Sequence, residues 1–241
     1  MDVKNAFLQG ALEEKVYMTL PPGHQKENNS NLVCRLKKSI YGLKQSPRSW
    51  YGKLSKFLIS CNFKISGGDS SLFTKQDQNG ITIVLVYVDD LIITVSDQVE
   101  IENIKNNLKQ KFDIKDLGNL KYFLGIEIAH SSKGLFLSQR KYTLDLLKET
   151  GKLGCKPAQT PIDINTKLNN EDGEPLDNVS QFQRLVGKLI YLTVTRPDIS
   201  FSVSQISQFM HSPRTPHMDA INRILRYLKG TPGKRHLDEE K

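Results

Sequence analysis

The 241-residue sequence lacks a long apolar run and has only three cysteines, and both scarcities exclude classes of protein. The longest apolar stretches, residues 81–88 and 91–95, fall far short of the ~18 residues that a membrane-spanning helix requires. The cysteines are odd in number and lack metal-ligand spacing, which excludes a disulfide framework and a cysteine-based metal site. The N-terminal stretch lacks the charged-then-apolar profile of a secretory signal. We therefore expect a cytoplasmic or nuclear protein with no membrane partner.

Acidic residues are also under-represented, because 26 Asp and Glu stand against 34 Lys and Arg, for a net charge of +8. A basic balance favours an anionic partner, with nucleic acid first and an acidic membrane surface second. The imbalance is strongest between residues 28 and 68, which contain no acidic residue. This pattern supports a solvated face of lysines and a phosphate-contacting surface equally. The basic residues of this stretch are Arg35, Lys37, Lys38, Lys44, Arg48, Lys53, Lys56 and Lys64.

The length suits one large domain or two small ones. Apolar patterns bounded by turn residues predict strands at residues 12–20, 70–76, 81–88, 91–95, 121–129 and 134–138. Residues 24–31 are predicted to form a polar loop, and residues 156–180, rich in Pro, Asn and Asp, a linker.

Helix-start signals predict the remaining elements. Ser46 is expected to cap a helix that has Pro47 at its first position and continues to residue 63. Ser96 or Asp97 caps the next helix, and the spacing of Asp97 and Glu100 indicates a capping box. Further helices are predicted at residues 139–150, 180–194, 198–210 and 216–229.

The segment VLVYVDDLIITV, residues 84–95, places two adjacent carboxylates between two apolar strands. Asp-Asp is a common turn dipeptide, but the near-continuous apolar flanks are typical of strands buried on both faces. Carboxylates there need a cation, and hard oxygen ligands suit Mg²⁺. Two such ions can bridge the attacking and leaving oxygens of phosphoryl transfer, given one more carboxylate from elsewhere. Val88 is β-branched at the tight turn, so we expect a strained backbone there.

Tyr87-Val88-Asp89-Asp90 after an apolar strand resembles motif C of reverse transcriptases. In chain order, residues 2–23, 40–51, 108–118 and 122–128 resemble motifs A, B, D and E of copia-type retrotransposon polyproteins. Residues 134–147 and 188–217 are similar to the thumb and to the stretch that leads to ribonuclease H. The sequence thus resembles the reverse transcriptase domain of a copia-type LTR retrotransposon Pol polyprotein over nearly its whole length.

The resemblance implies an α+β fold. It implies a palm in residues 1–130, with an antiparallel sheet that carries helices on one face. A thumb-like segment and linker follow in residues 131–178, and a mainly helical connection region in residues 179–241. A fingers subdomain and ribonuclease H would lie outside this sequence. Because the sequence begins one residue before Asp2 and chain ends fray, we expect a weakly held Asp2 and an inactive isolated chain.

The resemblance also implies roles for matching residues. Asp2, Asp89 and Asp90 would be catalytic and would hold two Mg²⁺, or Mn²⁺ instead, with the Val3 carbonyl as a further ligand. The primer 3′-hydroxyl would attack the α-phosphate of a dNTP and expel pyrophosphate, directed by an RNA template on a DNA primer. Phe7 would exclude a ribose 2′-hydroxyl. The other implied nucleotide-side residues are Tyr41, Gly42, Ser46, Pro47 and Lys115, the last assisting pyrophosphate departure. The implied nucleic-acid contacts are Lys44, Arg48, Tyr87, Val88, Tyr122, Leu124 and Gly125.

Other interpretations of the same residues stay open. Phe7 and residues 122–128 also suit ordinary core packing, and Lys115 a solvated position. The whole chain is either part of an RNA-directed DNA polymerase or a catalytically inactive retrotransposon relic with non-specific, salt-sensitive nucleic-acid binding. A two-metal nuclease or other phosphotransferase could use the same carboxylates, but the ordered set of motifs disfavours it.

Overall fold

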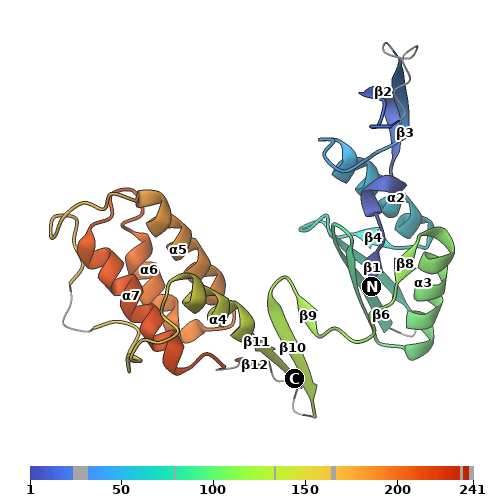
Figure 1. Cartoon of the computed structure of the whole chain (residues 1–241). Helices are drawn as coiled ribbons and strands as arrows, with labels where there is room; N and C mark the ends of the chain where they lie inside the picture. Colours follow the sequence, from blue (N-terminus) through green and yellow to red (C-terminus); the bar gives the residue numbers. More distant parts are fainter. Residues whose placement is uncertain (24–31, 79, 133, 164–166, 234–235, 239–241) are drawn as a thin grey trace. The chain divides into compact units, whose positions relative to one another are not determined.

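The computed structural model describes residues 1–23, 32–78, 80–132, 134–163, 167–233 and 236–238. The chain divides into two compact units, Met1–Asn119 and Leu120–Lys241. Together they form a mixed α/β protein with antiparallel sheets and, in the described part, helices α1 to α7 (Figure 1). This agrees with the expected α+β class, while the identification of palm, thumb and connection stays a prediction. None of the helices in the described residues is both long and apolar enough to cross a membrane.

A six-stranded sheet forms the centre of the first unit, and all its neighbouring strands are antiparallel. Its order is β4 (Lys64–Ile65), β5 (Leu72–Asp77), β6 (Gly80–Tyr87), β7 (Asp90–Val95), β1 (Asp2–Val3) and β8 (Ile114–Lys115). The two-residue strands β1 and β8 therefore extend the sheet beyond the β6–β7 hairpin.

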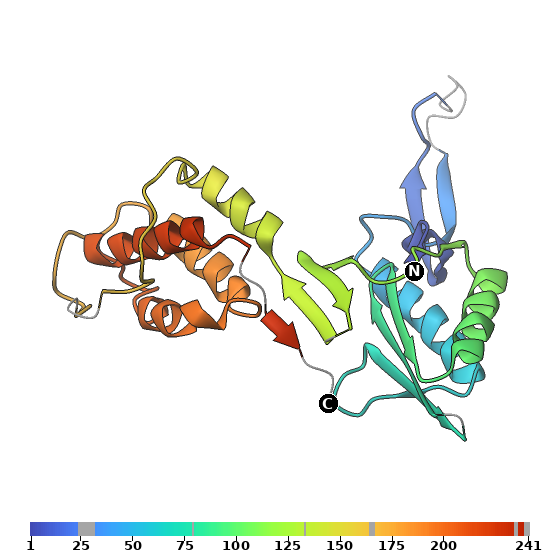
Figure 2. The same ribbon diagram turned by 90° about the horizontal axis from the view of Figure 1, so that it is seen from below.

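Helices α2 (Ser46–Ser60) and α3 (Gln98–Lys111) pack on the same face of this sheet (Figure 2). The ring of Phe112, the residue directly after α3, connects the two helices. Its centroid lies 5.3 Å from the ring centroids of both Trp50 and Phe57 of α2, and both contacts are edge-on. Alternate strand residues complete this core, as the period of a strand requires. The buried apolar strand residues are Val3, Phe73, Val84, Val86, Leu91 and Ile114.

The opposite face of the sheet is partly open in the described residues. Ile81 and Tyr87 of β6, which alternate with the buried Thr82, Val84 and Val86, are each about half exposed. The expectation that these strands are buried on both faces is therefore wrong. Helices cover only one face, and the carboxylates lie at the hairpin tip rather than inside a closed core.

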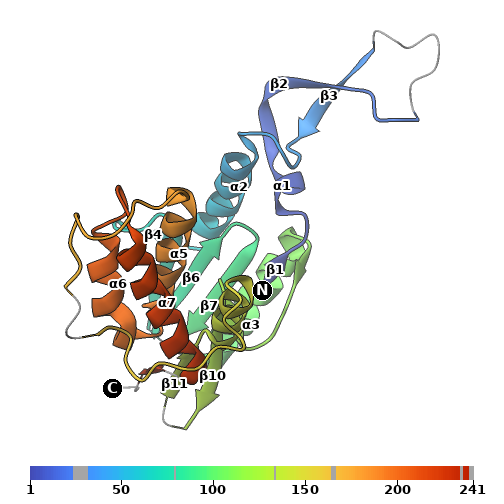
Figure 3. The ribbon, with the colours of Figure 1, turned by 60° about the vertical axis from the view of Figure 1, so that its left-hand side comes forward.

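A separate two-stranded ribbon projects from the first unit (Figure 3). It consists of β2 (Ala11–Thr19) and β3 (Val33–Lys38), and the short helix α1 (Ala6–Gln9) precedes it. Gly10 lies at the base of the ribbon, where a Cβ atom would stand 2.9 Å from Ser49 Cβ of α2. Only glycine allows this close approach. The predicted loop at residues 24–31 lies outside the described residues.

The second unit combines a small sheet with a helical bundle. The sheet order is β12 (His236–Asp238), β11 (Gly134–Ser138), β10 (Ile126–Ser131) and β9 (Tyr122–Phe123). The helices are α4 (Arg140–Glu149), α5 (Val179–Leu192), the 3₁₀ helix η2 (Pro197–Ile199), α6 (Ser200–Ser207) and α7 (Thr215–Gly230). Their shared core contains Leu147, Phe182, Leu189, Ile206, Ile221 and Leu228. In its described residues 156–163 and 167–178 the predicted linker is irregular, and it contacts α7 where Ala158 N donates to Arg226 O.

Three local predictions are corrected by the structure. The strand expected at residues 121–129 is split by a turn at Leu124–Gly125. Ser46 does not cap α2, since its buried hydroxyl donates to the Ile40 carbonyl oxygen and Gln45 is the cap residue. Asp97 does cap α3, through Val99 N, but no capping box forms because the Glu100 carboxylate accepts from Lys75 Nζ at 2.6 Å.

Candidate active site

The β6–β7 hairpin places both aspartates at its tip, as the sequence predicts. Tyr87 pairs with Asp90, so Val88 and Asp89 form a two-residue turn. Val88 has a φ of 55°, in the left-handed region that β-branched residues avoid. This confirms the expected strain, which costs about 1–3 kcal/mol and must be offset by the surroundings.

Trp50 supplies part of that compensation. Its indole Nε1 donates to the Val88 carbonyl oxygen at 2.6 Å, from a side chain that is fully buried on α2. The hydrogen bond fixes the orientation of the peptide that leads into Asp89. The sequence pattern gave no sign of this bond.

Strand β1 brings the third carboxylate to the same place. Asp2 is directly opposite Asp90 on β7 and opposite Lys115 on β8. Val3 N donates to the Asp89 carbonyl oxygen at 2.8 Å, and Leu91 N donates to the Met1 carbonyl oxygen at 2.9 Å. The expectation of a weakly held Asp2 is therefore wrong, since β1 is bonded on both of its edges.

The three carboxylates repel one another. Burial raises the pKa of Asp90, and the nearby carboxylates of Asp89 and Asp2 raise it further. A divalent cation would remove this repulsion, and a set of carboxylate oxygens is the donor type that Mg²⁺ prefers. In chemical type the residues fit such an ion. Within the described part of the chain, however, no group of three or more Asp, Glu, His or Cys side chains has the arrangement of a metal site.

The residues that match motif B lie around the start of α2. The rings of Phe7 and Tyr41 are in contact, with centroids 4.9 Å apart. Gly42 has a φ of 90°, which the turn before α2 requires. Pro47 occupies the first turn of α2 and is exposed, whereas Ser46 is buried. The structure thus brings Phe7 and Tyr41 together and directs the Ser46 hydroxyl into the fold.

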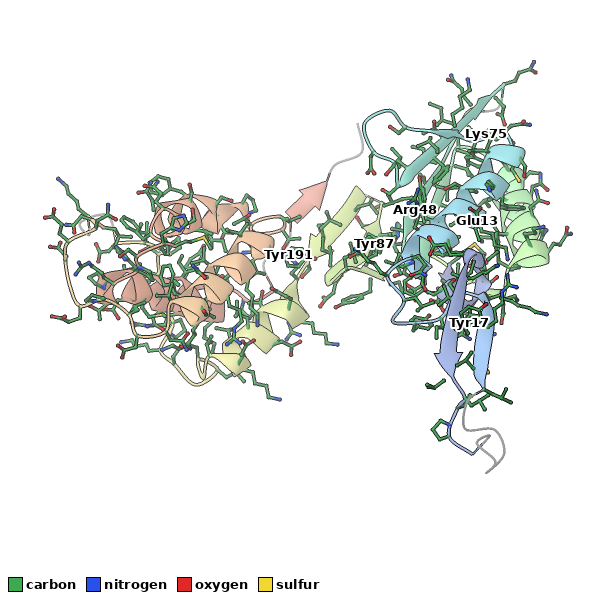
Figure 4. All side chains as sticks on the ribbon, turned by 90° about the horizontal axis from the view of Figure 1, so that it is seen from above. Glu13, Tyr17, Arg48, Lys75, Tyr87 and Tyr191 are labelled. Carbon is green, nitrogen blue, oxygen red and sulfur yellow. The ribbon has the colours of Figure 1, made fainter. Side chains whose placement is uncertain are left out.

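The cationic candidates are exposed. Arg48 of α2 and Glu13 of β2 line a groove of about 780 Å³ between the ribbon and the helix (Figure 4). Lys44 is exposed in the turn before α2. Lys115 is exposed opposite Asp2, so the two side chains leave the same face of the sheet.

The remaining candidates belong to the second unit. Tyr122 lies on β9, and Leu124 and Gly125 form the turn to β10, with φ values of 47° and 85°. The aspartates and this turn are therefore parts of different compact units. One residue that the sequence did not single out, Tyr191, contacts the turn, because its hydroxyl donates to the Leu124 carbonyl oxygen.

Comparison with known proteins gives consistent matches. Residues 1–164 match the family model described as Reverse transcriptase (RNA-dependent DNA polymerase). The chain is 48% identical over 232 residues to the Retrovirus-related Pol polyprotein from transposon RE1 of Arabidopsis thaliana, covering 96% of this chain and 16% of that polyprotein. It is 39% identical over 243 residues to the polyprotein from transposon TNT 1-94 of Nicotiana tabacum, covering 97% and 18%. It is 34% identical over 233 residues to the Putative transposon Ty5-1 protein of Saccharomyces cerevisiae, covering 96% and 76%. The chain therefore spans less than a fifth of the plant polyproteins.

Proposed function

The chain belongs to the reverse transcriptase (RNA-dependent DNA polymerase) family of copia-type retrotransposons, and on that basis we propose that it carries the nucleotidyl-transfer site of such a polymerase. The reaction joins the 3′-hydroxyl of a DNA primer to the α-phosphate of a dNTP and releases pyrophosphate, with RNA as template. The observation that supports this most is the pairing of Asp2 with Asp90 on adjacent strands, with Asp89 in the adjoining turn.

Asp2, Asp89 and Asp90, with the Val3 carbonyl, would hold two Mg²⁺ ions, or Mn²⁺ in their place. Such ions, when bound, stabilise the developing charge on the attacking and leaving oxygens. The protein contributes preorganisation, because electrostatic stabilisation requires groups that are already in position. Trp50 fixes the turn that carries Asp89, and the β1 hydrogen bonds fix Asp2.

The nucleotide is proposed to bind beside this site. The contacting Phe7 and Tyr41 rings form an aromatic wall, whose bulk suits a position that rejects a ribose 2′-hydroxyl. Gly42, Ser46 and Pro47 shape the turn next to that wall. Lys115, opposite Asp2, places an ammonium group on the face where pyrophosphate would leave.

The primer and template are proposed to contact exposed residues of both units. In the first unit these are Lys44, Arg48, Tyr87 and Val88, all exposed. In the second unit they are Tyr122, Leu124 and Gly125 of the β9–β10 hairpin. The cations would bind phosphate groups and the aromatic and apolar side chains would contact the sugar and base surface.

A primer-extension assay tests the proposal. The chain, alone and fused to the segment that precedes the matched region in the RE1 polyprotein, is given an RNA template, a DNA primer, dNTPs and Mg²⁺. We expect the fused form to extend the primer, Asp89→Asn to abolish extension, and Asp113→Asn to retain it. Asp113 is the matched control because its carboxylate is exposed and pairs only loosely, at 3.3 Å, with Lys4. Equal extension by the intact and Asp89→Asn forms would refute the assignment.

The second candidate function is non-specific nucleic-acid binding by an inactive relic, which the one-sided basic stretch of residues 28–68 favours. Binding through phosphates weakens steeply as salt rises. A filter-binding titration between low and high salt measures this. Salt-sensitive binding by a fused form that never extends a primer would support the relic, and no binding at low salt would exclude it.

A further inference from the structure

The tip of the β9–β10 hairpin is strained and exposed. Phe123 pairs with Ile126, so Leu124 and Gly125 form a two-residue turn, with φ positive at both positions. Glycine adopts this conformation freely, but leucine does not, and Asn or Gly is the usual residue there. Leu124 is 45% exposed and Tyr122 is 53% exposed. Burial therefore does not explain why the chain keeps a leucine in this conformation.

Tyr191, far along the chain, holds the tip. It lies in the last turn of α5 (Figure 4). Its hydroxyl donates to the Leu124 carbonyl oxygen. The Tyr142 ring of α4 meets the Tyr191 ring edge-on, with centroids 5.3 Å apart. A Cβ atom added to Gly125 would lie 3.5 Å from the Tyr191 hydroxyl oxygen. The hydroxyl is thus seated directly over the strained turn, and Tyr142 limits its freedom to rotate away.

A second hydrogen bond ties the same hairpin to the helices. Lys141 N, in the first turn of α4, donates to Glu127 Oε1 at 3.0 Å. Glu127 on β10 faces Tyr122 on β9. The hairpin is therefore attached at its tip and at its middle to α5 and α4, which explains why it belongs to the compact unit Leu120–Lys241.

Strain that the surrounding structure maintains is concentrated where a protein contacts a ligand. An ordinary connecting turn would reach lower free energy with Asn or Gly at position 124 and would need no hydrogen bond from a helix. Here the unfavourable residue is kept, its side chain faces outward, and a tyrosine from another element fixes its carbonyl. These three features together indicate an element that is preorganised for contact.

We propose that Tyr191 is a positioning residue for the contact between the β9–β10 tip and the primer strand. Its hydroxyl fixes the Leu124–Gly125 turn so that Tyr122 and Leu124 are presented to the nucleic acid in one orientation. The proposal rests on the proposed function, since it assumes a primer–template partner. It adds that the helical bundle sets the orientation of this contact.

The test compares two variants of the full chain, Tyr191→Phe and the matched control Tyr142→Phe. Both keep their aromatic rings, and only the first removes the hydrogen bond to Leu124. The readouts are the dissociation constant for an RNA–DNA primer–template at fixed low salt, amide hydrogen exchange at Gly125 and Ile126, and the urea midpoint. We expect Tyr191→Phe to weaken binding about three- to ten-fold and to speed exchange at the tip, with an unchanged urea midpoint. Tyr142→Phe should keep the binding constant.

Equal binding by wild type and Tyr191→Phe would overturn the proposal, and so would equal losses in the two variants. A wild-type chain that binds no primer–template would also overturn it. Failure of the catalytic assignment looks different, because extension is then absent or unchanged by Asp89→Asn, while the effect of Tyr191→Phe on binding remains.

Discussion

The strained turn of Val88 and Asp89 allows a comparison of two valines that lie two positions apart. We predict that Val88→Gly leaves the stability of the first unit within about 1 kcal/mol of wild type, whereas Val86→Gly destabilises it by about 3 kcal/mol. Both substitutions remove the same side chain from the same hairpin. They differ in backbone conformation and in burial, since Val88 has a φ of 55° and is 46% exposed and Val86 is 6% exposed in β6.

The magnitudes follow from these differences. At position 88, glycine relieves about 1–3 kcal/mol of left-handed strain, while its own flexibility costs about 0.5–1 kcal/mol. The half-exposed side chain gives up about 1 kcal/mol of burial, half of the value of about 2 kcal/mol for a fully buried valine. These contributions nearly cancel. At position 86 there is no strain to relieve, so lost burial of about 2 kcal/mol and the flexibility of glycine add together.

Equilibrium unfolding in urea, followed by the fluorescence of Trp50, measures both variants. Trp50 is the only tryptophan in the sequence, it lies in the first unit, and it bonds to Val88. A contrast of about 3 kcal/mol separates the two midpoints by about 1–3 M urea. If Val88→Gly lowered the midpoint as far as Val86→Gly does, the turn would not be strained and the reasoning would fail.

Three further predictions concern single side chains. Asp90→Asn should raise the melting temperature of the metal-free protein, because it removes a half-buried charge beside Asp89 and Asp2. Added Mg²⁺ should raise the melting temperature of wild type more than that of this variant. Equal increases in the two melting temperatures would count against metal binding. Burial lowers the pKa of His217, whose Nδ1 accepts from Arg214 N, so the unfolded chain takes up the proton first. Calorimetry should therefore show the second unit losing stability as the pH falls below about 6.5, and His217→Gln should flatten this slope. Arg196→Lys should destabilise the second unit by about 2–4 kcal/mol, because the buried guanidinium binds Asp198 and Thr231 in a fork that lysine cannot reproduce. The control is Arg184→Lys at an exposed position, which weakens only the 3.4 Å contact with Glu149. In the same calorimetric measurement this control should change stability by less than about 0.5 kcal/mol.

The sequence predicted the hairpin that carries Asp89 and Asp90, and the strain at Val88, for reasons that are local. Apolar strands set the pairing, and a β-branched residue at a tight turn has few conformations open to it. The helix that begins at Ser46 was also predictable, because Pro47 marks its first turn. Its cap was not, since Ser46 finds a partner in Ile40, which only the folded turn brings near.

Other parts of the site depended on tertiary packing. Periodicity shows which face of a helix is buried but not which atom that face meets, so the bonds from Trp50 to Val88 and from Tyr191 to Leu124 left no pattern. The break between β9 and β10 was missed because its turn contains leucine rather than Asn or Asp, and Gly125 alone was too weak a signal. The position of Asp2 likewise required the pairing of strands that are distant in sequence.

That distance has a consequence for the order in which the first unit assembles. The Met1 nitrogen bonds to the Leu91 carbonyl oxygen across 90 positions, and the other neighbour of β1, β8, comes later still. The β6–β7 hairpin can close locally, but β1 must wait for both of its neighbours. At typical rates of synthesis β7 leaves the ribosome roughly 1–4 s before β8 does. Asp2 therefore joins the other two aspartates last, and throughout that interval a nascent chain has its hairpin formed and its carboxylate triad incomplete.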